Sequence, residues 1–381
     1  MKVRYTYRTY PTPAQQAELA KVFGCVRYVY NWGLDQRIAA RQRGEKINYK
    51  QSSAALTLLK KAPEYKWLKE VSCVPTQQVL RHLDAAYGNF FAGRGKFPHF
   101  KSKRDRQSAE FTASAFKYEG SVLSLAKIGP LKVRWSRSFT SKPSTVTIIK
   151  TQTGKYYVTL CLDEVLTPYA LTDQSVGIDL GISHLATLSD GSTINNPRHT
   201  KKHQKRLAKA SRILSRRIKG SGRWNRQRVK VARLHETIAA TRKDHLDKVT
   251  TSLVRRFDII AIEDLNVRGM IKNRKLAKHI IDTSFGQFRT MLAYKCAWRG
   301  KRLVVVDRFY PSSKTCSCCG YVIAELPLRI RQWQCPTCNT QHDRDLNAAK
   351  NILAVGQTVS AHGVTGRPAN LEGLGAGCCE V

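Results

Sequence analysis

The sequence predicts an α/β fold class with additional β-rich and helical lobes, spread over more than one domain. The chain has 381 residues, which is too long for one small core and typical of two or three domains. Its apolar fraction of 42% can fill buried cores. Along the chain, a helical stretch is followed by short strands and then by alternating strands and helices, which indicates several lobes.

The N-terminal half is predicted to combine a small β-structure with helices. Residues 2–10 alternate in the manner of a strand. A helix follows Thr12, which can cap it, and Pro13 suits its first turn. A second helix has Pro75 near its start. Residues 109–163 hold short apolar runs separated by Gly and Pro, so we expect a small β-barrel or sheet there. The first strand could complete it, with the helices inserted between.

The C-terminal half is predicted to alternate strands and helices. A strand, a turn and a second strand begin near Ser175, and a helical region broken by Gly-Ser-Gly at 220–222 follows. The stretch "DIIAIEDL" at 258–265 predicts a short buried strand that ends in a carboxylate, and one more helix and strand come after it. Residues after Val355 are Gly-rich and aperiodic, which predicts a flexible tail.

The charge of the chain points to a polyanionic partner. Lys and Arg number 66 against 27 Asp and Glu, a net charge of +39. Nucleic acid is the expected partner, since a charge this large repels itself unless phosphates are nearby. An acidic membrane is disfavoured because the sequence has no apolar run of spanning length. The N-terminus has no secretory h-region, so we expect a cytoplasmic protein whose cysteines are thiols or metal ligands.

Two C-x2-C pairs separated by fifteen residues predict a zinc ribbon. The expected ligands are Cys316, Cys319, Cys335 and Cys338. Cys318 introduces an ambiguity, which the two-residue knuckle spacing resolves in favour of Cys319. His342 is nearby, but four thiolates leave it no vacant position. A closed four-thiolate sphere indicates a structural site rather than a catalytic one.

Three acidic residues stand at the ends of predicted elements. Asp179 lies inside the apolar "GIDLGI", Glu263 ends "IIAIE", and Asp345 begins a small-residue helix. Unpaired burial of such acids is costly, and three carboxylates that converge suit Mg²⁺ or Mn²⁺. Taken singly, each acid has a plainer explanation. "GIDLG" also resembles the phosphate loop of actin-like and sugar-kinase ATPases. Glu263 could be only a salt-bridge partner, and Asp264 could take its role in the triad. Asp343 or Asp345 could be a helix cap.

The motifs together resemble the TnpB proteins encoded by insertion sequences. The resemblance rests on "GIDLGISHLATLSDG", "IAIEDLNVRGM", "YPSSKTCSCCG", "WQCPTC" and "HDRDLNAAKNI", and it extends to "RYVYNWGLDQR" and "GKFPHFKSKRDRQS". It covers about residues 1–355. TnpB proteins in turn resemble the compact ancestors of type V CRISPR effectors. Cys318, an extra thiol between two ligands, departs from the family pattern.

The resemblance implies an RNA-guided, metal-dependent DNA endonuclease with a RuvC nuclease domain of RNase H-like fold. The family's acidic triad corresponds to Asp179, Glu263 and Asp345, the last through the D-x-N-x-A pattern in "DLNAA". It implies two-metal catalysis with Mg²⁺ or Mn²⁺, structural Zn²⁺, a lid after the second acid, and an arginine, Arg331, near the active site.

The resemblance also implies a domain order. We expect a β-barrel wedge domain with an inserted helical recognition domain, a RuvC domain with an inserted zinc ribbon, and a tail. The wedge domain is expected at 1–10 and 107–173, and the recognition domain at 11–106. The RuvC domain is expected at 174–314 and 340–356, the zinc ribbon at 315–339, and the tail at 357–381.

The implied partners are a guide RNA derived from the transposon end, double-stranded target DNA and the RNA–DNA heteroduplex. In such systems base pairing reads the sequence and the protein reads geometry and a short motif beside the target. The expected location is the prokaryotic cytoplasm, on the nucleoid through DNA. Two alternatives remain open at this point: a transposase that joins DNA strands, and a catalytically silent nucleic-acid-binding regulator.

Overall fold

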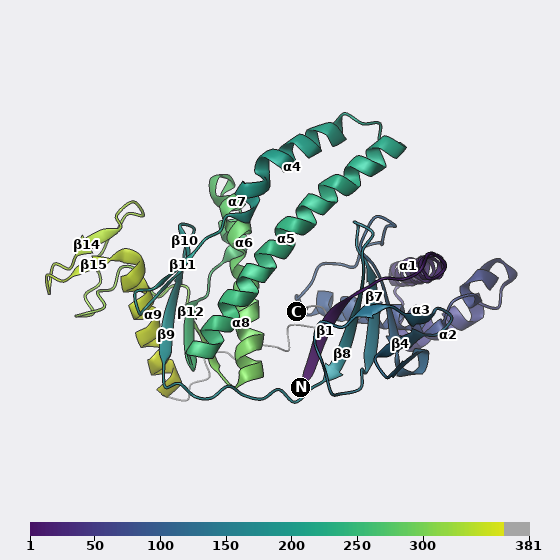
Figure 1. Ribbon diagram of the computed structural model, residues 1–381, viewed down its shortest axis with the longest axis horizontal. Helices are drawn as coiled ribbons and strands as arrows, with labels where there is room; N and C mark the ends of the chain where they lie inside the picture. The colour runs from purple at the N-terminus through teal and green to yellow at the C-terminus, as the bar shows by residue number, and fades with distance from the viewer. Residues whose placement is uncertain (362–381) are drawn as a thin grey trace. The chain divides into compact units, whose positions relative to one another are not determined.

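The computed structural model describes residues 1–361 and divides into two compact units, one of residues 1–165 and one that begins at residue 166. Each unit has a five-stranded sheet of its own. Figure 1 shows the elements of both units along the chain.

The first unit is built on an antiparallel sheet in the order β2-β7-β8-β1-β6. Its first strand pairs with β8 along its whole length, from Lys2 opposite Asp163 to Thr9 opposite Tyr156. The N-terminal strand therefore completes a sheet made of later strands, as predicted. A separate three-stranded sheet has the order β3-β4-β5, and the barrel closure stays a prediction. The strands are β1 Lys2–Thr9, β2 Gln107–Thr112, β3 Phe116–Glu119, β4 Val122–Leu125, β5 Gly129–Leu131, β6 Val133–Arg134, β7 Thr145–Lys150 and β8 Tyr156–Asp163.

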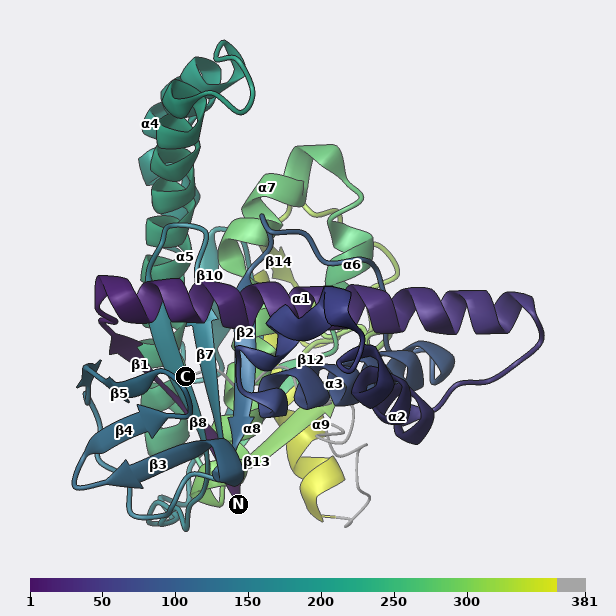
Figure 2. The same cartoon turned by 90° about the vertical axis from the view of Figure 1, so that its right-hand side faces the viewer.

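Helices fill the interval between β1 and β2. The longest, α1 (Pro13–Gln42), begins at the predicted cap, where Thr12 and Gln15 bond reciprocally as a capping box. It packs against α3 (Cys73–Phe91), where Gly33 leaves room for Leu80 and Leu83, and Figure 2 shows its full length. The interval also holds α2 Tyr49–Leu59 and the 3-10 helix Pro63–Lys69, and a second short 3-10 helix, Ala113–Ala115, follows β2.

The second unit is built on a mixed sheet in the order β11-β10-β9-β12-β13. β9 and β13 both run parallel to β12, and the β9–β10–β11 meander is antiparallel. Parallel strands buried on both faces need apolar side chains throughout, which fits Val176, Ile178, Ile260 and Ile262, all fully buried. The strands are β9 Ser175–Leu180, β10 His184–Leu188, β11 Thr193–Asn195, β12 Ile259–Glu263 and β13 Arg302–Val306.

Helices cover both faces of this sheet. α9 lies along β9 and β12 on one face, and α8 with α5 lies on the other (Figure 1). The predicted break at Gly-Ser-Gly separates α4 from α5, and Ser221 caps α5. A small hairpin, β14 (Gln332–Gln334) with β15 (Gln341–Asp343), precedes α9. The helices are α4 His199–Ser215, α5 Gly222–Arg256, α6 Val267–Met270, α7 Arg274–Thr283, α8 Phe285–Arg299 and α9 Arg344–Ala361.

The C-terminal helix is longer than predicted. α9 continues to Ala361, so the expectation of a flexible tail from residue 357 is wrong for its first five residues. The rest of the predicted tail, 362–381, lies outside the described residues. Among the helices of residues 1–361, none has the length and apolar character that crossing a membrane requires.

Candidate functional site

Two of the predicted acids end neighbouring parallel strands. Asp179 is the second-last residue of β9 and Glu263 is the last residue of β12. The strands pair in register, with Ile262 opposite Ile178, so Glu263 comes level with Asp179 at the same edge of the sheet. Carboxyl ends of parallel strands meet at one edge, which is where open α/β sheets place their sites.

The third predicted acid comes from the first turn of α9. Asp345 is the second residue of that helix. Its neighbour Asp343 has a different task, because its Oδ1 accepts the N–H groups of Asp345 at 3.1 Å and Leu346 at 3.0 Å. Asp343 is therefore the helix cap, and Asp345 remains available to face the sheet edge.

The electrostatics of Asp179 link the three acids. Burial and the negative charges of Glu263 and Asp345 raise the pKa of Asp179 to about 7, against an ordinary value of 3.8. Arg344 and Arg331 oppose that rise without cancelling it. The charges of Glu263 and Asp345 therefore act on Asp179, and a divalent cation bound beside it would relieve that repulsion.

Asp264 does not belong to this group. Its two oxygens pair with the guanidinium groups of Arg289, from α8, and Arg308, which follows β13. These charge-assisted bonds lower the pKa of Asp264 against the effect of its burial. The alternative in which Asp264 replaces Glu263 therefore has no support in the structure, because its carboxylate is already neutralised.

Other side chains hold the acids in place. Arg331, the arginine expected from the family resemblance, donates to Asp345 Oδ1 at 3.1 Å. The hydroxyl of Ser312 donates to Glu263 Oε1, and Ser312 is only 6% exposed. Sequence reasoning missed Ser312, although it lies in the quoted motif "YPSSKTCSCCG". A single serine in a motif does not by itself indicate a functional role, and the cysteines that follow it give the stronger pattern.

A cavity of about 290 Å³ opens beside Glu263. Its polar lining includes Asn266, Arg268, Arg289 and Arg308, while Leu180, Leu265, Val267 and Phe285 supply apolar walls. Arg289 and Arg308 are paired with Asp264, and Arg268 adds a further guanidinium group of the kind that suits a phosphate of a nucleic acid strand.

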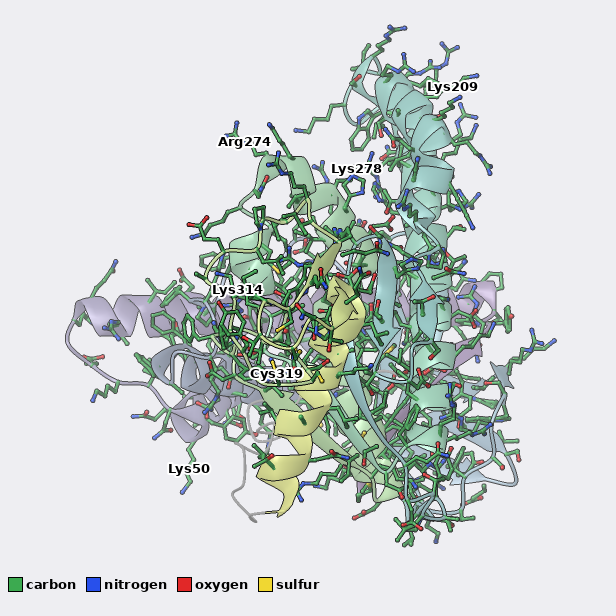
Figure 3. The ribbon with its side chains drawn as sticks, turned by 90° about the vertical axis from the view of Figure 1, so that its left-hand side faces the viewer. Lys50, Lys209, Arg274, Lys278, Lys314 and Cys319 are labelled. Atoms are coloured by element: carbon green, nitrogen blue, oxygen red, sulfur yellow. The ribbon has the colours of Figure 1, made fainter. Side chains whose placement is uncertain are left out.

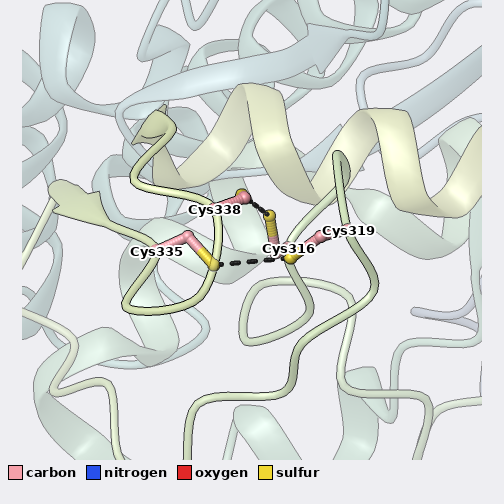
Figure 4. A group of neighbouring side chains, drawn as sticks. All are labelled: Cys316, Cys319, Cys335 and Cys338. Carbon is pink, nitrogen blue, oxygen red and sulfur yellow. Dashed lines mark hydrogen bonds between the residues drawn. The ribbon is translucent and has the colours of Figure 1, made fainter.

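The four predicted cysteines converge. The sulfurs of Cys316, Cys319, Cys335 and Cys338 all lie within 4.8 Å of one another, and among the described residues this is the one such group found. Figure 4 marks two of the sulfur pairs, Cys316 with Cys338 and Cys319 with Cys335, each 3.6 Å apart. Tetrahedral Zn²⁺ with Zn–S bonds of about 2.3 Å requires sulfurs roughly 3.8 Å apart. The geometry therefore fits a structural zinc ion.

The surroundings of the sulfurs support the same ligand set. Cys318 is exposed and lies outside the group, which agrees with the knuckle spacing. Hydrogen bonds with the side chain and main chain of Thr340 lower the pKa of Cys338 to about 6, which favours the thiolate that a metal needs. His342 Nε2 lies 3.0 Å from Cys316 Sγ, so the histidine contacts a ligand and is outside the group of four.

A basic helical hairpin extends from the second unit. Residues 198–233, which span α4 and the first part of α5, hold Lys and Arg throughout and no Asp or Glu. No residue of α4 is buried, and Figure 3 shows Lys209 at the surface of this helix. Such a stripe of positive charge is the expected footprint of a phosphate backbone.

Comparison with known proteins gives relatives over nearly the full length. A "Putative RNA-guided DNA endonuclease" of Streptomyces pristinaespiralis is 49% identical over 375 residues, which cover 97% of this chain and 92% of that protein. "Putative RNA-guided DNA endonuclease InsQ" of Escherichia coli strain K12 is 34% identical and covers 97% of this chain and 96% of its own length. "TnpB-like protein L79" of Acanthamoeba polyphaga mimivirus is 29% identical over 59% of this chain and 46% of its own. The chain belongs to the TnpB family.

Family models match three stretches of this TnpB protein. Residues 155–274 match a family described as "Probable transposase", and residues 285–352 match the "Cas12f1-like, TNB domain". Residues 1–46 match a "Helix-turn-helix domain", although here they form β1 and the single helix α1.

A solved structure supports the mixed fold. The Cas12f1 chain of a Cas12f1–sgRNA–target DNA complex matches with a TM-score of 0.57 and 12% identity, over 89% of this chain and 82% of that one. At this identity the likeness concerns the fold alone.

Proposed function

We propose that this TnpB protein is an RNA-guided DNA endonuclease that cleaves target DNA with the carboxylates Asp179, Glu263 and Asp345. The observation that carries the proposal is the convergence of these acids, expressed in the effect of Glu263 and Asp345 on the pKa of Asp179. The names of its full-length relatives supply the guide and the substrate class.

The proposed site holds Mg²⁺ or Mn²⁺ through the three carboxylates. When bound, such ions activate a water molecule and stabilise the leaving oxygen of a phosphodiester. The protein's own part is to fix the ligands: the strand register aligns Asp179 with Glu263, and the cap at Asp343 sets the start of the helix that carries Asp345. Arg268, in the cavity beside Glu263, would position a phosphate of the bound strand.

The wider architecture follows from the same proposal. The second unit would be a RuvC domain of RNase H-like fold, which its mixed five-stranded sheet supports. The four cysteines would form a zinc ribbon within residues 315–339, α6 and α7 the lid, and the first unit the wedge and recognition domains.

RNA that copurifies with the chain tests the guide. Expressed with its native flanking DNA, the protein should carry one abundant RNA that ends in sequence outside the element. That RNA should then direct Mg²⁺-dependent cleavage of a matching target. Random cellular RNA, or strand-joined products formed without RNA, would instead favour the regulator or the transposase.

Paired substitutions at neighbouring acids test the catalytic assignment. Glu263→Gln and Asp179→Ala should lower the cleavage rate by at least about 100-fold, because each removes a proposed metal ligand. Asp264→Asn is the matched control and should keep most of the activity, since its carboxylate is bonded to Arg289 and Arg308. RNA binding should persist in all three variants. Normal cleavage by Asp179→Ala would refute the assignment.

Metal analysis tests the ribbon. The purified chain should contain about one zinc ion, and Cys335→Ser should lose it and melt at a lower temperature, because the metal contributes to folding. Cys318→Ser should retain the zinc. Loss of zinc from both variants would contradict the ligand set.

A further inference from the structure

We propose that Ser312 is a positioning residue that orients the carboxylate of Glu263 for metal binding, and that two asparagines of α9 hold Ser312 in place. The inference rests on the proposed metal site. It adds a residue outside the three acids and connects the sheet edge to the segment that leads into the cysteine knuckle.

The first observation is the contact between Ser312 and Glu263. The Ser312 hydroxyl donates to Glu263 Oε1, and this is the one hydrogen bond that the structure gives to that carboxylate within residues 1–361. A glutamate at the end of a strand has three rotatable side-chain bonds. A buried hydroxyl donor restricts them and leaves the second oxygen free for a cation.

The second observation is how Ser312 is fixed. Asn351 donates from Nδ2 to the carbonyl oxygens of Ser312 at 2.8 Å and Thr315 at 2.6 Å. Asn347 lies one turn earlier on the same face of α9, donates to the Thr315 carbonyl at 2.7 Å and accepts the Ser317 N–H at 2.9 Å. These amides therefore bind the 312–317 segment at both of its ends.

Burial gives these contacts their weight. Asn347 is 1% exposed and Asn351 is 4% exposed. A buried amide is costly unless its polar atoms are bonded, so the two asparagines are tied to this one arrangement of the segment. Since α9 also carries Asp345, the same helix sets the position of one proposed ligand directly and of Glu263 through Ser312.

A positioning role and a purely structural role of Ser312 lead to different expectations. Loss of the hydroxyl should weaken the metal site and leave the fold intact. A structural serine would affect folding and leave the metal affinity of the folded fraction unchanged.

The test is a Mn²⁺ titration of the full-length, zinc-loaded chain, followed by the electron paramagnetic resonance signal of free Mn²⁺. The relevant Mn²⁺ site is the one that Asp179→Ala abolishes. Ser312→Ala should raise the Kd of that site about 10-fold. Ser312→Thr, which keeps the hydroxyl, should have the Kd of the wild type. Ser317→Ala is the matched control: it keeps the N–H that Asn347 accepts and should leave the Kd unchanged. Excess Mn²⁺ should also recover the cleavage rate of Ser312→Ala.

The role of the asparagines has its own test. Asn351→Ala should raise the Kd for Mn²⁺ as Ser312→Ala does. The double variant should bind Mn²⁺ no more weakly than Ser312→Ala alone, because both substitutions act through the hydrogen bond from Ser312 to Glu263. Circular dichroism would establish that each variant is folded, and an unfolded Asn351→Ala would leave the decision to the two Ser312 variants.

The outcomes separate the two proposals. Equal Kd values for Ser312→Ala and the wild type, with binding still abolished by Asp179→Ala, would overturn the role of Ser312 alone. If Asp179→Ala bound Mn²⁺ with the Kd of the wild type, the proposed metal site would be wrong, and this inference with it.

Discussion

Adjacent acids in this chain have different tasks, and their hydrogen bonds show which is which. Asp343 accepts two main-chain N–H groups, and Asp264 accepts two guanidinium groups. Asp345 has one arginine partner, and Glu263 has one serine partner. Asp343 and Asp264 are thus bonded within the fold, whereas the charges of Glu263 and Asp345 both raise the pKa of Asp179.

The raised pKa of Asp179 predicts an unusual pH dependence of stability. In the unfolded chain this acid ionises near its ordinary value of 3.8, and in the folded metal-free chain it ionises near 7. Between these values the unfolded state loses its proton first, so the folded state is progressively penalised as the pH rises from about 4 to 7. Above pH 7 the penalty is constant.

Asp179→Asn should therefore stabilise the metal-free protein at pH 8 by about 2 kcal/mol, because the amide carries no charge in the carboxylate cluster. The gain should shrink as the pH falls toward 5. Denaturant melts in the presence of a chelator of Mg²⁺ would measure it, and added Mg²⁺ should raise the melting temperature of the wild type only. An advantage of the variant that does not depend on pH would contradict this account of Asp179.

At the scale of elements, the key packing is that of α9 on β9. The helix touches the sheet at Gly177, where an added Cβ would lie 2.0 Å from the carbonyl oxygen of Ala349. Ala349, which makes this contact, and its neighbour Ala348 are both buried. Further along the helix, Gly356 makes a similar approach to Ala261. Small residues on both elements thus bring Asp345 close to the sheet edge.

Gly177→Ala should lower the free energy of unfolding of the second unit by about 3 kcal/mol, because α9 must move away from β9 to admit one methyl group. The same shift would displace Asp345, so Mn²⁺ affinity should fall in the folded fraction. Gly222→Ala is the matched control, since its Cβ would meet nothing within 4 Å. Thermal melts of both variants would measure the difference, and equal melting temperatures would refute the close packing.

At the scale of the whole molecule, the excess of positive charge favours binding to nucleic acid through its phosphates. The net charge is +39, and a run without acids occupies the α4–α5 hairpin, residues 198–233. Each phosphate contact releases bound counterions, so affinity falls with salt in proportion to the number of contacts.

Replacement of Lys205, Lys209 and Arg212 by Gln should reduce the salt dependence of duplex binding. If all three contact phosphates, the slope of log K against log salt should fall by about two to three. A matched control replaces the exposed Lys46, Lys50 and Lys66, which lie near Glu45 and Glu64 in sequence and should change the slope less. Fluorescence anisotropy over a range of salt concentrations would measure both slopes. Equal changes in the two triple variants would place the phosphate contacts elsewhere.

Much of the fold follows from local patterns. The cap at Thr12, the alternation of β1, the break before α5 and the buried strand β12 all lie where the sequence predicts them. Each depends on residues within a few positions of one another, so the local chain contains the information. The end of α9 was misplaced because glycines after residue 355 suggest a break, whereas burial of Gly356 against Ala261 allows the helix to continue.

The sequence by itself determined the family, the excess of positive charge and the acids and cysteines to be tested, because residue types and spacings are written in the chain. Only the tertiary structure decided that Asp264 is neutralised, that Asp343 caps a helix, and that Ser312 reaches Glu263 from 49 residues away. Those assignments depend on where side chains of distant segments point, and that direction is set by strand register and by the packing of α9, which no local pattern contains.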